Sequence, residues 1–541
     1  VRYSVSGNIA SDQAVIVEPD SSFKLAQSGK NDIDCTVTGV NNAKTSFTYA
    51  DGLRKDNSLT SDYILSTPDM TAGKWNGTYH TNISLSTEYV YYSSIERAAN
   101  DANNLTNENA DIARSNIENA EAALTFEDNK AKIMLFRNAE DVEEIDLTQD
   151  TTIDMNAKSI NFASGKGFST NNNLTLYDGT INATNPGTTA TASTYALITN
   201  ANPDATLTLN DCIINDEHTA DTSKNTYEIY SKGYVNFDSA TEINSTGAGN
   251  SNYFFASMFV LNPTVNNVKN AKINMTIDNA KSLRGIQTNA GEFNVDNLKM
   301  KLSLKKGYAY GLYQSVDKNA SITNSSIDID IENSGAGSNY GIAIFKAADV
   351  VLKKNNITVS ANSSDTSSTT KNNMCVYLNG GTTTSKKVTS SDNVFTNSSN
   401  DASNTNEFGY SCMSSINLFK STNDTIKFNS KSKSSYGINS VAQATEISGL
   451  TSDMNINATD VSYGVCMAQV GSKDSTVVNS TFTGEQKGTG IVQLIDSSGI
   501  TTVTNHNGFN FTGNTGITTA IRAYDTILSN CTLEANYNNI P

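Results

Sequence analysis

Several residue types are scarce in this chain of 541 residues, and each scarcity excludes a class of protein. Proline occurs only 6 times, which argues against a disordered proline-rich stalk. The formal net charge of -17 disfavours a nucleic-acid partner, because such binding depends on cationic side chains that neutralise phosphates. No apolar run approaches the roughly 20 residues of a membrane-spanning helix, so we expect no membrane insertion.

Cysteine and histidine are also few, and their spacing is uninformative for metal or redox chemistry. Zinc and redox motifs use closely spaced cysteine pairs, and small secreted domains use dense disulfides. Neither pattern is present, so we expect unpaired thiols and assign no cofactor and no metal ligand. The cysteines are Cys35, Cys212, Cys375, Cys412, Cys466 and Cys531, and the histidines are His80, His218 and His506.

The abundant residues are Asn, Ser and Thr, which suit turns and solvated strand faces better than helix interiors. Residues 1–88 alternate between apolar and polar positions and predict a β-sandwich of immunoglobulin-like size. The only tryptophan, Trp75, is expected to fill its core.

Residues 89–131 are expected to form a helical cap or linker. Apolar residues recur at three and four positions between Ser93 and Leu124, which is helical spacing, and Ser93 with Glu96 has the form of a capping box. A stack of repeats needs its first layer covered, and a helix can do this.

Residues 132–541 are dominated by a repeated unit that begins with an aromatic residue followed by a small one. Successive starts lie about 26 to 35 residues apart, a period typical of solenoids. A second signature is a polar corner before an apolar strand, as at Asp211, Asn324, Asn479 and Asn530, where the left-handed backbone is tolerated. The unit starts include Tyr195, Tyr227, Tyr253, Tyr310, Tyr340, Tyr436 and Tyr463.

These features predict an all-β chain whose main part is a parallel β-helix of about twelve coils, because each coil must stack on its neighbours to bury apolar residues. The segment from Ile133 to Phe162 and the helical lead-in from Ser94 to Ala102 resemble the entry to the pectin-lyase-like right-handed parallel β-helix superfamily. This resemblance implies a right-handed single-stranded solenoid. It leaves the activity open, because the superfamily includes polysaccharide lyases and hydrolases, adhesins and phage tailspikes.

No motif for chemistry stands out. The sequence strings of polygalacturonase-like members are missing, and individual acids such as Asp211, Asp328 and Asp330 are expected to face solvent. Cys375 and Cys466 are expected to be buried inert thiols in an internal ladder, and the recurring tyrosines are expected to stack inside that ladder. We interpret the basic and aromatic stretch from Lys305 to Tyr310 as a solvated turn.

The sequence therefore favours a non-catalytic extracellular surface rod, an adhesin or display module that binds a glycan or a protein of a host or neighbouring cell. Two alternatives remain open: a polysaccharide lyase or glycoside hydrolase, and a phage tailspike or tail fibre, which would be a homotrimer on the virion tail. The chain begins at Val1 without a leader pattern, so we expect a processed or excised N-terminus. No catalytic or ligand-binding residue is assigned.

Overall fold

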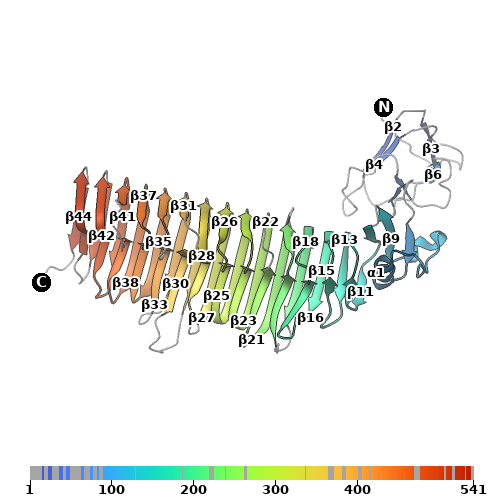
Figure 1. Cartoon of the computed structure of the whole chain (residues 1–541), viewed down its shortest axis with the longest axis horizontal. Helices are drawn as coiled ribbons and strands as arrows, with labels where there is room; N and C mark the ends of the chain where they lie inside the picture. The colour runs from blue at the N-terminus through green and yellow to red at the C-terminus, as the bar shows by residue number, and fades with distance from the viewer. Residues whose placement is uncertain are drawn as a thin grey trace. The chain divides into compact units, whose positions relative to one another are not determined.

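A computed structural model describes most of the chain after residue 88 (Figure 1). Before residue 89 it describes only short strands. The chain forms two compact units, residues 1–183 with 208–214, and residues 184–207 with 215–541, which we describe separately. Beyond residue 88 the described ranges are 89–127, 130–185, 187–218, 224–237, 239–260, 265–334, 337–362, 371–380, 386–399, 405–412, 416–467, 475–504, 507–513, 518–529 and 532–537.

The prediction of an all-β chain is confirmed, with 73% strand and 4% helix. No described helix is long and apolar enough to cross a membrane. The solenoid has about 9 turns, slightly fewer than the predicted count of about twelve.

The first unit begins with seven short strands in three small sheets. Two strand pairs are parallel, β1 with β3 and β2 with β4, and two are antiparallel, β3 with β6 and β5 with β7. The predicted sandwich core stays a prediction, because the structure does not describe the side chain of Trp75. The strands are β1 (Val15–Val17), β2 (Ser22–Ala26), β3 (Thr36–Gly39), β4 (Lys44–Thr48), β5 (Tyr63–Leu65), β6 (Lys74–Asn76) and β7 (Asn82–Ser84).

The helical segment of the first unit is shorter than predicted. Helix α1 spans Ile95–Asn104 and a 3-10 helix, η1, spans Arg114–Asn119, whereas Ala122 already belongs to a strand. The N-cap is Ser94, whose side chain accepts from the Arg97 N–H, and not Ser93 as the capping-box pattern suggested. The apolar spacing near Leu124 belongs to a buried strand, because short apolar runs fit both periods.

Helix α1 covers the start of the solenoid in the first unit. Its buried face includes Ile95 and Ala102, and the side chain of Asn103 donates to the carbonyl of Asp146 and accepts from the N–H of Thr148. Strands β10, β13 and β15 pair in parallel, with Ile133, Ile153 and Leu176 in register. The strands are β8 (Val90–Tyr92), β9 (Ala122–Glu127), β10 (Lys130–Leu135), β11 (Ala139–Val142), β12 (Ile145–Leu147), β13 (Thr151–Phe162), β14 (Phe168–Thr170) and β15 (Leu174–Thr184).

The second unit is a stack of parallel strands in chain order (Figure 1). One antiparallel pair, β16 with β17, precedes residue 200. The strands are β16 (Thr188–Thr191), β17 (Thr194–Asn200), β18 (Thr206–His218, partly in the first unit), β19 (Asn225–Ser231), β20 (Tyr234–Phe237), β21 (Thr241–Val260), β22 (Val265–Lys269), β23 (Ala271–Thr288), β24 (Glu292–Asp296), β25 (Lys299–Gln314), β26 (Lys318–Thr323), β27 (Ser326–Ser334), β28 (Asn339–Lys353), β29 (Asn356–Ala361), β30 (Lys371–Gly380), β31 (Lys387–Ser391), β32 (Val394–Ser399), β33 (Thr405–Cys412), β34 (Leu418–Thr422), β35 (Thr425–Ser432), β36 (Ser434–Ser440), β37 (Ala444–Ser448), β38 (Thr451–Ala458), β39 (Ser462–Met467), β40 (Ser475–Val478), β41 (Thr481–Gln486), β42 (Val492–Thr504), β43 (Asn507–Gly513), β44 (Thr518–Ser529) and β45 (Thr532–Tyr537).

The core of this unit consists of aligned apolar side chains. One internal row runs through strands β23, β25, β27, β29, β32 and β35, and each member is buried and in register with the next. Each coil contributes too few apolar residues to form a core alone, so stacking is required for burial. The row comprises Ile273, Met300, Ile327, Ile357, Phe395 and Ile426.

The predicted polar corners are confirmed where the structure describes them. Asp211, Asn324 and Asn479 have φ values of 50°, 51° and 52°, in the left-handed region that Asn and Asp tolerate. Asn530 lies outside the described residues.

The residue after a corner points inward and bonds its equivalent in the next coil. Ser325 N–H donates to Asn355 Oδ1 (3.0 Å), the Asn355 amide side chain donates to Asn393 Oδ1 (3.0 Å), and that of Asn393 donates to Asp424 Oδ1 (3.0 Å). This row, Ser325–Asn355–Asn393–Asp424, satisfies polar groups that would otherwise be unpaired in the core.

Candidate functional site

The glycine of each Tyr-Gly unit faces the interior of the second unit. A Cβ atom on Gly311 would lie 2.7 Å from Cγ2 of Ile327, and a Cβ on Gly341 would lie 2.3 Å from Cγ2 of Ile357. Both isoleucines belong to the buried core. Glycine is therefore required at these positions, because a side chain there would clash with the core. Because successive side chains of a strand point to opposite faces, the aromatic residue before each glycine points outward.

These outward residues form a continuous line that we call the outer aromatic row. Each member is the register partner of the next along parallel strands β23, β25, β28, β30, β33, β36 and β39. Neighbouring rings stack: the ring centroids of Tyr310 and Tyr340 are 4.9 Å apart, and those of Phe408 and Tyr436 are 4.6 Å apart. The row comprises Arg284, Tyr310, Tyr340, Met374, Phe408, Tyr436 and Tyr463.

A second line of outward residues lies three positions further along the same strands. Tyr313 and Tyr377 belong to it, and both pack with the outer aromatic row in one apolar cluster that also includes Phe345. Their rings do not stack on their neighbours: Tyr313 meets Tyr310 edge-on at 88°, and Tyr377 is tilted against Tyr340 at 54°. We call this line the second row, comprising Gln287, Tyr313, Ala343, Tyr377, Ser411, Asn439 and Cys466.

Arg284 begins the aromatic part of this surface. Its guanidinium carbon lies 4.3 Å from the ring centroid of Phe254 and 5.1 Å from that of Tyr313, both cation–π distances. Its side chain also donates to Gln287 and, at 3.2 Å, to Ser282. The positive charge is thus held against aromatic faces.

The tyrosines therefore stack along the solenoid as predicted, but on its outer side. Tyr340 and Phe408 are each 8% exposed, while Tyr310, Tyr313, Tyr377, Tyr436 and Tyr463 are half-buried. Cys375, which occupies the glycine position, is fully buried as predicted, and burial raises the pKa of its thiol. Cys466 is half-buried and belongs to the second row, so the prediction of an internal position is wrong for it.

The stretch from Lys305 to Tyr310 is part of strand β25 and not a turn. Gly307, with φ at 137°, bends the strand, and Lys305 forms an ion pair of 2.6 Å with Asp278. The exposure of Asp211 and Asp330 agrees with the prediction of a solvated face, while Asp328 is half-buried and burial raises its pKa.

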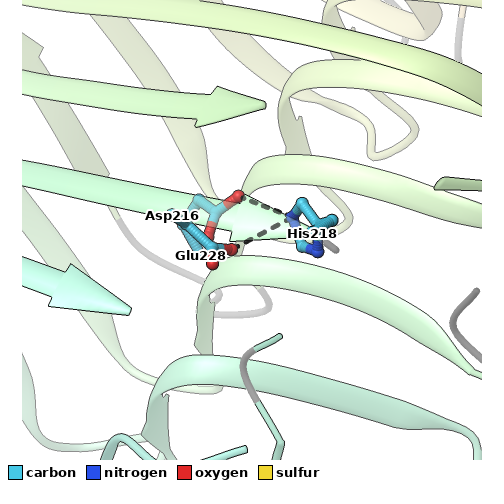
Figure 2. Close-up of side chains that lie close together, drawn as sticks. All are labelled: Asp216, His218 and Glu228. Atoms are coloured by element: carbon cyan, nitrogen blue, oxygen red, sulfur yellow. Dashed lines mark ion pairs between the residues drawn. The ribbon is translucent and has the colours of Figure 1, made fainter. Parts of the chain in front are cut away.

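A different kind of site lies inside the second unit. Strand β18 alternates so that Asp216 and His218 point inward while Glu217 is exposed, and Glu228 enters from strand β19. Figure 2 shows both carboxylates directed at the same nitrogen of His218. Nε2 lies 3.0 Å from Asp216 Oδ2 and 3.8 Å from Glu228 Oε1, and Ser245 Oγ is 3.2 Å from it.

This acid–histidine cluster is excluded from solvent. The side chains of His218, Asp216 and Glu228 are 3%, 0% and 1% exposed, and the ring of Phe255 meets the imidazole edge-on at 5.2 Å. Burial and the Glu228 carboxylate raise the pKa of Asp216 well above its usual range. Burial alone would lower the pKa of His218, but the two carboxylates outweigh it and raise this pKa to about 10. For Glu228 the effect of burial is outweighed by His218, so its pKa is lowered.

Sequence reasoning missed this cluster because it considered the histidines one by one. The available signal was the inward period of two that continues from Ile214 through Asp216 to His218, which places two polar groups among core positions. Glu228 could not be found in this way, because strand pairing, not spacing, brings it close. His80 and His506 lie outside the described residues.

In comparisons with known proteins, no family model, no curated protein and no solved structure matches the chain.

Proposed function

We propose that the chain is a non-catalytic extracellular module, an adhesin or display protein of the cell surface, that binds a neutral glycan along the outer aromatic row and the second row. The observation that carries the proposal is the register-aligned line of half-buried tyrosines on the outside of the second unit. A buried core needs no aromatic strip on its outer side, and contiguous apolar patches on a surface commonly mark binding sites.

The chemistry of the two rows fits a hydroxyl-rich, uncharged ligand. The rows offer tilted rings whose faces can receive sugar C–H groups, together with the half-buried polar side chain of Asn439. The hydroxyl of Tyr310 is protonated at neutral pH and able to donate, and burial raises its pKa further. The net charge of -17 disfavours acidic polysaccharides.

The position of the clustered acids supports binding without turnover. Glycoside hydrolysis places two carboxylates on either side of a bound sugar, roughly 5 to 9.5 Å apart. Asp216 and Glu228 are instead enclosed in the core, out of reach of a polymer on the outer face.

The test is binding of the purified chain to immobilised neutral and acidic polysaccharides, with product release measured in parallel. The double variant Tyr313→Ala/Tyr377→Ala should weaken binding to neutral glycans by about tenfold or more, since a loss of about 1.4 kcal/mol is a factor of ten. Val351→Ala is the matched control, because Val351 is 42% exposed and belongs to neither row.

Three outcomes would contradict the proposal. Binding to proteins but not to glycans would show that the ligand is a protein. An equal loss of binding in Val351→Ala would show that the two rows are not the binding site. Sustained release of sugar products that a single Asp or Glu substitution abolishes would make the chain an enzyme.

A further inference from the structure

We propose that Asp216, His218 and Glu228 bind a divalent transition-metal ion inside the solenoid, with zinc as the best match. This site is separate from the glycan-binding proposal and lies in the core. Its role is structural, because its enclosure leaves no path for a substrate.

The spacing of the donor atoms fits a small tetrahedral ion. One donor atom from each residue lies within 4.8 Å of the others. Zinc bound at about 2.0–2.2 Å to nitrogen and oxygen separates its tetrahedral ligands by roughly 3.3 Å. The observed separations from His218 Nε2, 3.0 Å to Asp216 Oδ2 and 3.8 Å to Glu228 Oε1, lie on either side of that value. Ser245 Oγ, 3.2 Å from Nε2, is placed to supply the fourth donor.

The carboxylate oxygens give a second and independent indication. Among the described residues, no hydrogen bond of good geometry reaches either oxygen of Asp216 or Oε2 of Glu228, although all three are buried and Asp216 Oδ2 lies 3.0 Å from His218 Nε2. Native proteins rarely leave such oxygens without a donor, because each unpaired buried polar atom costs about 1–3 kcal/mol. A cation among them would satisfy these oxygens together.

A doubly charged ion would balance the charge of the cluster. Ionised carboxylates of Asp216 and Glu228 beside a neutral imidazole carry two negative charges in a site excluded from solvent, and buried charges must be paired or bound to metal. A divalent ion neutralises both carboxylates and leaves His218 neutral, the form in which it binds metals. Without an ion, the same balance requires a proton on Asp216 and a charged His218, which is the state that the raised pKa values of both groups describe.

The backbone around the cluster allows Ser245 to come close to it. Gly247 of strand β21 has φ at 136°, and a Cβ there would lie 2.1 Å from the carbonyl oxygen of His218. Strand β21 can therefore approach the end of β18 closely enough to bring Ser245 to the cluster. The strands β18, β19 and β21 would thus be joined by one ion.

The direct test is the metal content of the intact chain. The chain is refolded with or without Zn²⁺, freed of loose metal and analysed by mass spectrometry; we expect about one zinc per chain. Co²⁺ in place of zinc should give the visible absorption bands of a tetrahedral site, a readout that requires no variant. Because metal binding is coupled to folding, a chain refolded with a chelator should unfold at a lower temperature.

The variants Asp216→Asn and Glu228→Gln keep the shape of the side chains and should each reduce zinc occupancy by at least tenfold. Asp424→Asn, which alters another buried acid of the second unit without a neighbouring histidine donor, should leave the occupancy unchanged. The proposal would be overturned if the folded wild-type chain held no stoichiometric zinc, nickel, cobalt or manganese and the chelator left its unfolding temperature unchanged. The carboxylates and His218 would then be held together by shared protons. Equal loss of metal in Asp424→Asn would place the ion elsewhere.

Discussion

At the scale of single residues, the stacking of the coils depends on polar side chains that are buried in the core. The inward row from Ser325 to Asp424 replaces apolar packing with hydrogen bonds between coils, and left-handed corner residues make the turns that direct it inward. Asp424 ends this row with a carboxylate that accepts from the Asn393 N–H (2.9 Å) and from Ser421 Oγ (2.6 Å). It is 1% exposed.

Asp424→Asn should change how stability depends on pH. Burial, opposed by the hydrogen bonds of Ser390, Ser421 and Asn393, raises the pKa of Asp424. Between the unfolded and folded pKa values the folded chain therefore holds a proton that the unfolded chain has lost, so stability falls as pH rises through that range. The variant has no carboxyl group at this position and does not lose stability in this way as pH rises. Its unfolding temperature relative to wild type should thus be higher at about pH 7 than at about pH 4.

Asp330→Asn, at an exposed position, is the control and should show no such dependence. Asp424→Ala should lower stability by about 1–3 kcal/mol, because it leaves the donors of Asn393 and Ser421 unpaired. An equal loss for Asp424→Asn at both pH values would contradict the electrostatic argument.

Leu105→Gly should stabilise the first unit. Leu105 ends helix α1 with φ at 51° and is 43% exposed, so its side chain gains little from burial. A left-handed L-residue costs roughly 1–2 kcal/mol, and part of this is offset by the greater freedom of glycine in the unfolded chain. We expect a net gain of about 0.5–1 kcal/mol in thermal or denaturant unfolding. The comparison is Asn324→Gly, where Asn already tolerates this backbone and the gain should be smaller.

At the scale of elements, the sequence predicted what local pattern determines. Polar corners, short apolar strands and the repeat period follow from neighbouring residues, and Asn324 and Asn479 have the predicted backbone. The sequence pattern did not predict that the tyrosines point outward. Gly311 and Leu312 are both buried between the outward Tyr310 and Tyr313, so the strand does not alternate simply between inward and outward residues. The acid–histidine cluster depends on pairing between strands, which no single segment encodes.

Gly341→Ala should destabilise the second unit by about 1–3 kcal/mol, as overpacked cores do. The added methyl would lie 2.3 Å from Cγ2 of Ile357 and 2.6 Å from the carbonyl oxygen of Cys375, which is backbone and cannot rotate away. Lys346→Ala, exposed in the same strand, should change stability by no more than about 0.5 kcal/mol in the same denaturant titration. Similar unfolding of the two variants would show that the interior at Gly341 is not tight.

At the scale of the whole molecule, the predicted all-β fold class is confirmed. The all-β composition and the parallel solenoid follow from a low apolar content and a regular repeat period. A repeat with so few apolar residues can bury them only by stacking on its neighbours. Cys375, Cys412 and Cys466, which lie on the different strands β30, β33 and β39, agree with this view. Cys212, Cys375 and Cys466 carry reduced thiols, while the side chains of Cys35, Cys412 and Cys531 lie outside the described residues.

The denatured, unreduced chain should therefore show six reactive thiols in a titration with a thiol reagent. In the native chain Cys212 and Cys375 should react last, because both are buried and burial raises the pKa of Cys212 to about 12. The half-buried Cys466 should react before them. A denatured count below six would reveal a disulfide and contradict the prediction of unpaired cysteines.

The equivalence of successive corners has a consequence for how such a chain can change in evolution. Asn297 and Asn324 have nearly the same left-handed backbone, with φ values of 55° and 51°, and the strands that follow them, β25 and β27, are paired in register. A gene that loses the segment between two such corners rejoins matching positions, and every remaining side chain keeps its face. A duplication does the same in reverse. Recombination can therefore adjust the length of the outer aromatic row by whole coils, whereas the acid–histidine cluster, which draws on three particular strands, limits where such an exchange keeps the cluster intact.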